Sequence, residues 1–269
     1  MSNSHDFRVE QLVSGYDHKT IIHGIDLEIP KNKISVIIGA NGCGKSTLLK
    51  TIAKLIKPIA GEVTLDGKAI NKYPPKQLAR MLGLLPQSPV VPEGITVSDL
   101  VGRGRFPHQS LLGGWSTKDY QAVEEAMEFM KITEFADYDL DELSGGQRQR
   151  VWIAMALAQQ TDILLLDEPT TFLDITYQVE ILDLLTSLNR KFGTTIVMVL
   201  HDINLSARYA DHIFAVKDGK LIAEGCPSEV LTSDLVKSAF DLNCVVIPDP
   251  ISDTPLIIPK GRYHIKQTK

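Results

Sequence analysis

The chain has 269 residues, of which 43% are hydrophobic and 23% are charged, and its formal net charge is −5. That content suits one large domain or two small ones with a buried core. Because the chain has no block of lysine or arginine residues, nucleic acid is not an expected partner. No apolar run reaches the roughly 18 residues that span a bilayer, and residues 1–10 lack a signal-peptide pattern, so we expect a cytoplasmic protein. Three cysteines at unrelated spacings indicate neither a disulfide framework nor a zinc site.

Short β-rich runs alternate with helical segments along the chain. Residues 7–16 and 20–29 alternate between apolar and polar side chains and predict an antiparallel β layer. Four runs without such alternation predict parallel strands buried on both faces by helices, namely KISVIIG, LGLLPQ, DILLLDE and TTIVMVLHD. The core is therefore predicted to be a doubly wound α/β sheet. Residues 91–159 read as a helical insertion, and the proline-rich residues 243–269 read as an extended tail.

The stretch GANGCGKST has the form of a P-loop, G-x-x-x-x-G-K-[ST], between a predicted strand and a predicted helix. Its N–H groups can wrap a phosphate chain, the helix dipole favours the negative charge, and Lys45 reaches the terminal phosphates. Ser46 is the expected Mg²⁺ ligand. The alternative is a glycine-rich turn that merely starts a helix. The candidate nucleotide-binding residues here are Gly39, Asn41, Gly42, Cys43, Gly44, Lys45, Ser46 and Thr47.

Cys43 lies inside this loop, beside a predicted helix N-terminus and Lys45. Both neighbours favour the thiolate, so we expect alkylation of Cys43 to inactivate the protein and ATP to protect it. The alternative is that Cys43 is only a small residue that faces inward.

Polar residues end three of the predicted strands, where a parallel sheet presents its ligand crevice. Asp167 is the expected Mg²⁺ ligand of a P-loop site, and Glu168 is the candidate general base that polarises water in line with the γ-phosphate. Gln87 and His201 end two other strands. The alternatives are a helix start at Asp167–Glu168 and an ordinary polar residue at His201, with Asp202 capping the next helix.

The sequence LSGGQ precedes a predicted helix, and Ser144 with Gln147 has the form of a capping box. The cap explains the serine but not two glycines, which normally stand where another backbone or a ligand comes close. No lysine or Mg²⁺ ligand lies nearby in sequence. We therefore expect this helix start to meet the nucleotide of a second copy, so that two chains placed head to tail bury two ATP molecules.

Together, these motifs resemble the ATP-binding subunits of the ABC transporter family. The resemblance covers about residues 8–240, and the domain is expected over residues 5–242. It rests on Tyr16, GANGCGKST, Gln87, LSGGQRQR, ILLLDEP, Asp174 and His201.

The resemblance implies an ATPase with Mg²⁺ as cofactor. It implies that Tyr16 stacks on adenine, that Gln87 senses Mg²⁺ and the attacking water, and that His201 contacts the γ-phosphate. It also implies that Ser144, Gly146 and Gln147 serve the opposite subunit's nucleotide and that Asp174 communicates between the two sites. Phe172 stands where many members have a small residue.

The stretch DLVGRGRFPH, with TTFLDI and DPISDTPLIIP, is similar to ATPases of importers for ferric siderophores, haem and cobalamin, and most similar to the siderophore group. That resemblance implies a permease and, indirectly, a substrate-binding protein as partners, at the cytoplasmic face of the membrane. Arg103, Arg105 and Phe106 are expected on an irregular surface that docks on the permease; the alternative is a helix stop with two solvated arginines. A soluble non-transport ABC ATPase and an ATP-binding protein without turnover remain alternatives.

Overall fold

We describe the protein from a computed structural model, which covers residues 4–17, 19–87, 93–109, 114–261 and 263. The chain forms two compact units, and both are discontinuous in sequence. The first unit contains Met1–Asp6 and Thr64–Val197, and the second contains Phe7–Val63 and Met198–Lys269. The chain leaves the second unit after Val63 and returns to it at Met198. The ATP-binding domain expected over residues 5–242 stays a prediction.

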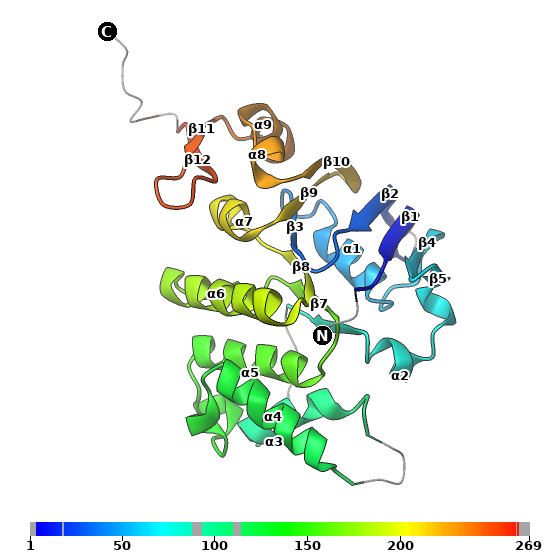
Figure 1. Cartoon of the computed structure of the whole chain (residues 1–269). Helices are drawn as coiled ribbons and strands as arrows, with labels where there is room; N and C mark the ends of the chain where they lie inside the picture. The colour runs from blue at the N-terminus through cyan, green and yellow to red at the C-terminus, as the bar shows by residue number, and fades with distance from the viewer. Residues whose placement is uncertain (1–3, 18, 88–92, 110–113, 262, 264–269) are drawn as a thin grey trace. The chain divides into compact units, whose positions relative to one another are not determined.

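The first unit contains the predicted helical insertion and two of the predicted parallel strands (Figure 1). Its helices and strands are β5 (Lys68–Ala69), α2 (Pro75–Leu78), β6 (Leu82–Leu85), α3 (Val97–Gly102), α4 (Thr117–Phe129), α5 (Gly145–Ala158), β7 (Ile163–Asp167) and α6 (Ile175–Phe192). Short 3₁₀ turns occupy Ile70–Lys72, Arg103–Arg105, Thr133–Phe135 and Leu140–Glu142. Two further strands, β4 (Ala60–Leu65) and β8 (Thr195–Val199), run from one unit into the other.

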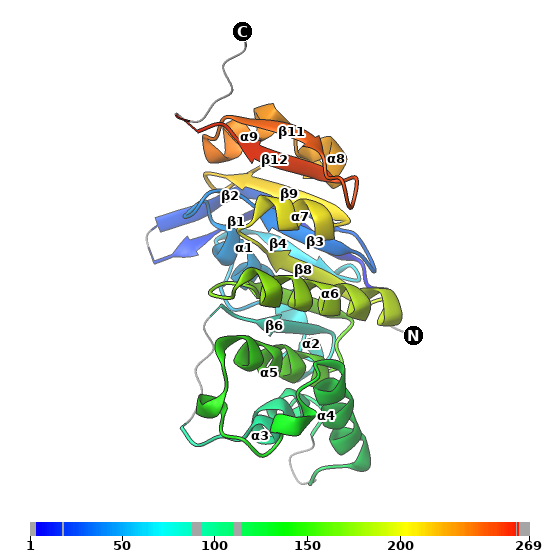
Figure 2. The same ribbon diagram turned by 90° about the vertical axis from the view of Figure 1, so that its left-hand side faces the viewer.

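Helices α3, α4 and α5 pack side by side, as both ribbon views show (Figures 1 and 2). Side-chain caps start them: Thr96 begins α3, and a capping box of Ser116 and Asp119 begins α4. Strands β6 and β7 pair in parallel, with Leu82 opposite Ile163. All five residues of β7 are buried, as its unbroken apolar run predicts.

The second unit contains the predicted antiparallel layer and the strand before the P-loop. Its helices and strands are β1 (Phe7–Tyr16), β2 (Lys19–Ile29), β3 (Ile34–Ile38), α1 (Lys45–Ile52), α7 (Ile203–Tyr209), β9 (His212–Lys217), β10 (Lys220–Gly225), α8 (Pro227–Val230), α9 (Ser233–Phe240), β11 (Cys244–Pro248) and β12 (Pro255–Pro259). Strands β1 and β2 are antiparallel, which confirms the predicted layer. The buried strand β3 pairs in parallel with β9, and β9 pairs antiparallel with β10.

The segment expected as an extended tail is instead a β-hairpin, so that expectation was wrong for residues 244–259. Strands β11 and β12 pair antiparallel from Cys244↔Pro259 to Pro248↔Pro255, and each end of the ladder has at least one proline. The Asn204 side chain of α7 binds both backbone groups of Ile257: its Nδ2 donates to the carbonyl oxygen at 3.2 Å, and its Oδ1 accepts from the N–H at 2.8 Å. The hairpin is therefore fixed to α7.

Among the described residues, no helix combines the length and the apolar character that crossing a membrane requires.

Candidate functional site

The predicted P-loop forms a tight turn between β3 and α1. Gly39 has φ 152° and Gly44 has φ 106°, values that L side chains rarely adopt. A Cβ on Gly39 would lie 2.1 Å from the carbonyl oxygen of Val216, and one on Gly44 would lie 2.8 Å from Cδ1 of Ile22. Backbone angle therefore favours glycine at both positions, and the Val216 backbone also leaves no space for a side chain at position 39.

Lys45 begins α1, and its side chain turns back into the loop. The ammonium group donates to the carbonyl oxygens of Gly39 at 2.9 Å and Ala40 at 3.1 Å, and the residue is 5% exposed. The first turn of α1 contains no acidic residue, so the partial positive charge at the helix start is not neutralised locally. Asn41 and Gly42 at the tip of the loop are exposed. The loop thus combines N–H groups, a cation and an open tip, which suits a phosphate chain.

Cys43 does not have the activated thiol that the sequence predicts. It is 5% exposed, and burial raises the pKa of its thiol even though Lys45 acts in the opposite direction. The residue is held by its neighbours, since its carbonyl oxygen accepts from the N–H of Gly219 at 3.0 Å. The alternative, a small residue packed inward, describes Cys43 correctly.

In the first unit, two of the predicted strand-end residues lie in direct contact. Glu168 follows β7, Gln87 lies two residues after β6, and Nε2 of Gln87 donates to Oε2 of Glu168 at 2.5 Å. Asp167 ends β7 and is 1% exposed, while Glu168 is 9% exposed. Because β6 and β7 are parallel neighbours, their carboxyl ends meet at one edge, which is why these side chains converge.

Glu168 also has two features that the sequence did not reveal. Its φ is 56°, in the left-handed region that a glutamate rarely adopts and that is common at functional sites. The hydroxyl of Thr171 donates to Oε2 of Glu168 at 3.0 Å. A hydroxyl three residues after a candidate base is the signal that could have identified Thr171, because one turn brings such residues together.

At the start of α5, the predicted capping box is present. The Ser144 N–H donates to Oε1 of Gln147 at 2.9 Å, and the Gln147 N–H donates to Oγ of Ser144 at 3.3 Å. The two glycines have different environments. A Cβ on Gly146 would lie 2.8 Å from the ring of Tyr177 in α6, whereas one on Gly145 would have none of the described atoms within 4 Å. Close packing within the chain is therefore one reason for a glycine at position 146, whose contact with a nucleotide stays a prediction, and Gly145 has open space beside it.

The remaining predicted residues lie at element ends. In the first unit, Asp174 caps α6 by accepting the N–H of Tyr177 at 3.1 Å. In the second unit, Tyr16 ends β1 and is 46% exposed, so its ring has an accessible face. His201 is exposed and stands between β8 and Asp202, which caps α7 by accepting the N–H groups of Asn204 and Leu205.

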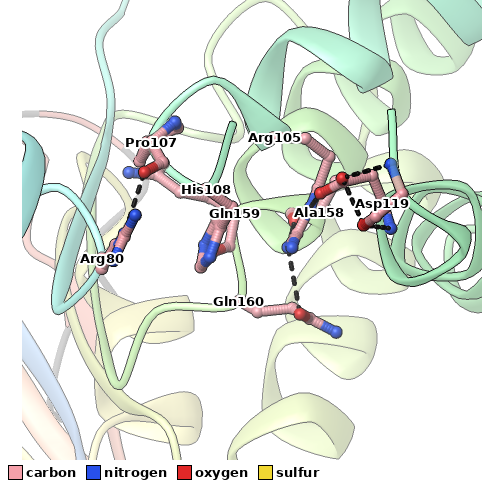
Figure 3. Close-up of polar contacts among 9 residues, drawn as sticks. Arg80, Arg105, Pro107, His108, Asp119, Ala158, Gln159 and Gln160 are labelled. Atoms are coloured by element: carbon pink, nitrogen blue, oxygen red, sulfur yellow. Dashed lines mark hydrogen bonds and ion pairs between the residues drawn. The ribbon is translucent and has the colours of Figure 1, made fainter. Parts of the chain in front are cut away.

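Arg105, expected on a docking surface, is instead buried. It is 4% exposed, and its guanidinium donates to Oδ1 of Asp119 at 2.9 Å, to the carbonyl oxygen of Ala158 at 2.7 Å and to Oε1 of Gln160 at 3.0 Å (Figure 3). The expectation failed because Asp119, on another helix, supplies a buried counter-charge. Neither the open-surface prediction nor the alternative of a solvated arginine holds for this residue.

The glycines around Arg105 permit close packing at the point where α3 ends. A Cβ on Gly104 would lie 2.1 Å from the carbonyl oxygen of Met155, and one on Gly102 would lie 2.5 Å from the ring of Trp115. Phe106 remains exposed, at 73%, and Arg103 is exposed beside it. The following residues, 110–113, lie outside the described part of the chain.

Three comparisons with known proteins agree with this geometry. Residues 22–171 match the family model described as "ABC transporter". The chain is 56% identical over 253 residues to the "Probable siderophore transport system ATP-binding protein YusV" of Bacillus subtilis, covering 94% of this chain and 92% of that protein. It is 50% identical to the "Ferric enterobactin transport ATP-binding protein FepC" of Escherichia coli, covering 95% and 94%.

Among solved structures, the chain is similar to the dimeric bacterial ABC transporter cassette MJ0796. The TM-score is 0.72 with 31% sequence identity, over 82% of this chain and 98% of that one. The family match spans the P-loop, the start of α5 and the end of β7, where most of the candidate residues lie, while Tyr16, Asp174 and His201 lie outside it. The chain belongs to the ABC transporter family, as one of its ATP-binding proteins.

Proposed function

We propose that this protein hydrolyses ATP to drive import of a ferric siderophore through a separate membrane permease. The assignment of the cargo rests on sequence identity of 50–56%, over nearly the whole chain, to ATP-binding proteins named for siderophore and ferric enterobactin transport. The protein acts at the cytoplasmic face of the membrane as a peripheral subunit, and a substrate-binding protein delivers the chelate to the permease. Haem and cobalamin importers are the runners-up.

The nucleotide-binding residues and the Mg²⁺ ligands have distinct roles in this proposal. The P-loop, with Lys45 and Thr47, wraps the phosphates, and Tyr16 stacks on adenine. Ser46 in the second unit, and Asp167 and Gln87 in the first, offer the oxygen donors that Mg²⁺ takes and would be its ligands. Among the described residues, no group of three or more His, Cys, Asp or Glu side chains could hold a metal ion by itself. Mg²⁺ is therefore expected to bind together with the nucleotide, whose phosphate oxygens it neutralises.

The proposed reaction is in-line attack of water on the γ-phosphorus. Glu168 accepts a proton from the water while the water oxygen forms its bond to phosphorus. The bond between the γ-phosphorus and the bridging oxygen breaks, and ADP leaves. Lys45 and His201 stabilise charge on the γ-phosphate. The left-handed backbone and burial of Glu168 support its assignment as the base.

The role of Glu168 is tested by Glu168→Gln, which removes the base but keeps the shape of the side chain. ATP binding should stay normal, while Mg²⁺-dependent phosphate release should fall by at least about 10²-fold. Asp162→Asn is a matched control, because Asp162 lies before β7 rather than after it. Near-normal phosphate release from Glu168→Gln would show that another group is the base.

The nucleotide-binding site is completed by a second copy of the chain, placed head to tail. Ser144, Gly146 and Gln147 at the start of α5 face the nucleotide bound by the partner's P-loop, with Gly145 beside them, and Asp174 links the two sites. The exposure of Ser144 and the open space at Gly145 support this arrangement. Gly146 also allows α5 to approach Tyr177, since a Cβ at this position would lie 2.8 Å from the Tyr177 ring.

Permease docking is assigned to the exposed Phe106, with Arg103 beside it. A large apolar ring on a rigid support suits an anchor in an interface, and Arg105 supplies that support. Phe106→Ala should abolish ATP-driven uptake while the isolated subunit still hydrolyses ATP. Tyr138→Ala, at another exposed aromatic residue of the same unit, is the control and should leave uptake normal.

The cargo is tested by uptake of labelled ferric siderophores, haem and cobalamin. Cells that lack this subunit, and hold no redundant ATPase, should lose siderophore uptake and regain it with the wild-type gene but not with Glu168→Gln. Loss of haem or cobalamin uptake instead would select a runner-up. Unchanged uptake of all three compounds would overturn the importer assignment.

A further inference from the structure

The loop between β7 and α6 brings a second hydrogen-bond donor to Glu168. The Thr171 hydroxyl donates to Oε2 at 3.0 Å, and the Thr171 N–H donates to the backbone carbonyl oxygen of Glu168 at 3.3 Å. Nε2 of Gln87 donates to the same carboxylate oxygen at 2.5 Å. Two donors from different segments therefore converge on one oxygen of a carboxylate that is 9% exposed.

Such convergence fixes the orientation of the carboxylate. A hydrogen bond to a charged oxygen is about twice as strong as one between neutral groups, and two of them on one atom restrict rotation of the side chain. The left-handed φ of 56° sets the direction in which the Glu168 side chain leaves the backbone. Backbone and donors together determine where the second oxygen points.

Thr171 itself is held by both ends of its loop. On one side is the end of β7. On the other, the start of α6 is fixed by Asp174, which caps the helix, and by Gln178, whose Nε2 donates to the carbonyl oxygen of Leu173 at 2.9 Å. Between them, Phe172 has φ 65° and is 95% exposed, so burial of its ring does not shape the loop. The polar contacts do so instead.

We propose that Thr171 is a positioning residue for Glu168, whose hydroxyl aims the carboxylate at the attacking water. This inference rests on the proposed function, in which Glu168 is the general base. A misplacement of about 1 Å can cost about 10²-fold in rate, so loss of the donor lowers turnover. Nucleotide binding, which depends on other residues, stays unchanged.

Two substitutions separate this role from an ordinary turn residue. Thr171→Val has nearly the same shape and keeps the backbone hydrogen bond to Glu168, but it removes the hydroxyl. Thr171→Ser keeps the hydroxyl and removes only a methyl group. Thr186→Val makes the same change in α6, where the hydroxyl donates to the Leu182 carbonyl oxygen at 2.8 Å, away from Glu168.

The experiment measures kcat and KM for ATP, nucleotide affinity and Tm for the three variants. Thr171→Val should lower kcat by about 10- to 100-fold with unchanged KM and nucleotide affinity. Thr171→Ser and Thr186→Val should both keep kcat within about twofold of wild type. A purely structural role would lower the Tm of Thr171→Val and Thr171→Ser alike, and the two variants would not differ in kcat.

Three results would overturn the inference: a normal kcat in Thr171→Val, an equal loss in Thr171→Ser, or a loss explained by weaker nucleotide binding. These results are distinct from failure of the proposed function. Turnover that survives Glu168→Gln rejects the base itself. Turnover that is lost in Glu168→Gln but retained in Thr171→Val rejects only the role of Thr171.

Discussion

Arg105 is the residue whose burial most changes the interpretation of its segment. Its contacts with Asp119, Ala158 and Gln160 join the turn after α3 to α4 and to the end of α5. His108 extends the same support, since its Nε2 donates to the carbonyl oxygen of Gln159 at 2.8 Å and burial lowers its pKa. Loss of either charge in the buried pair would leave the other uncompensated.

We therefore predict that Arg105→Ala destabilises the protein by about 3–5 kcal/mol, because Asp119 would remain charged and buried. For a chain of this size, that corresponds to a Tm lower by about 6–20 °C. Arg103→Ala, two residues away and exposed, should change stability by no more than about 0.5 kcal/mol. Calorimetry of both variants tests this, and equal Tm values would contradict the assignment.

The pH dependence of stability should also report on Asp119. The hydroxyl and N–H of Ser116, and then Arg105, lower the pKa of this carboxyl from 3.8 to about 2. A lowered acid pKa stabilises the folded state above pH 3.8, and that stabilisation is lost as the pH falls through about 2. Asp119→Asn should therefore unfold less steeply between pH 4 and 2 than wild type, measured by circular dichroism. Parallel curves would show that other carboxylates dominate.

At the scale of helices and strands, the two adjacent glycines at the start of α5, Gly145 and Gly146, have different surroundings. Gly146→Ala places a Cβ 2.8 Å from the Tyr177 ring, so it should force α5 and α6 apart and cost about 1–3 kcal/mol. Tyr177→Leu in the same chain should recover part of that loss. Full stability of Gly146→Ala would show that α5 shifts without cost.

Gly145→Ala is the matched substitution at the open position. It should not reduce the stability of the isolated chain, because alanine favours a helix over glycine by about 0.5–1 kcal/mol. It should nevertheless weaken ATP-dependent pairing of two chains, measured by sedimentation. Normal pairing by Gly145→Ala would mean that this glycine faces solvent in the dimer as well.

The elements most visible in the sequence were those with a purely local signature. The capping box of Ser144 and Gln147 and the buried run of β7 depend on neighbouring residues, and both are present. Contacts with distant segments were not predicted: Gly146 packs against the ring of Tyr177, and Arg105 is buried against the carboxylate of Asp119. The β11–β12 hairpin was missed because its prolines were interpreted as the sign of an extended tail, whereas they lie at the ends of its strands.

At the scale of the whole molecule, we predict that ATP drives dimerisation. Hydrolysis-deficient Glu168→Gln should sediment as a monomer alone and as a dimer with ATP, since the start of α5 has no P-loop lysine of its own. Ser144→Arg in that background should prevent the shift, because a large side chain would block the exposed cap. A monomer at saturating ATP would reject the shared site.

The discontinuous second unit has a consequence for synthesis on the ribosome. Strand β3 and the P-loop emerge early, but β9, a parallel partner of β3, begins at His212. The N–H of Gly219 then closes on the carbonyl oxygen of Cys43, and the carbonyl oxygen of Val216 packs against Gly39. The nascent phosphate loop thus acquires its final shape only after most of the message has been translated. Until its neighbouring strands have emerged, the apolar strand β3 is a segment that a chaperone should cover.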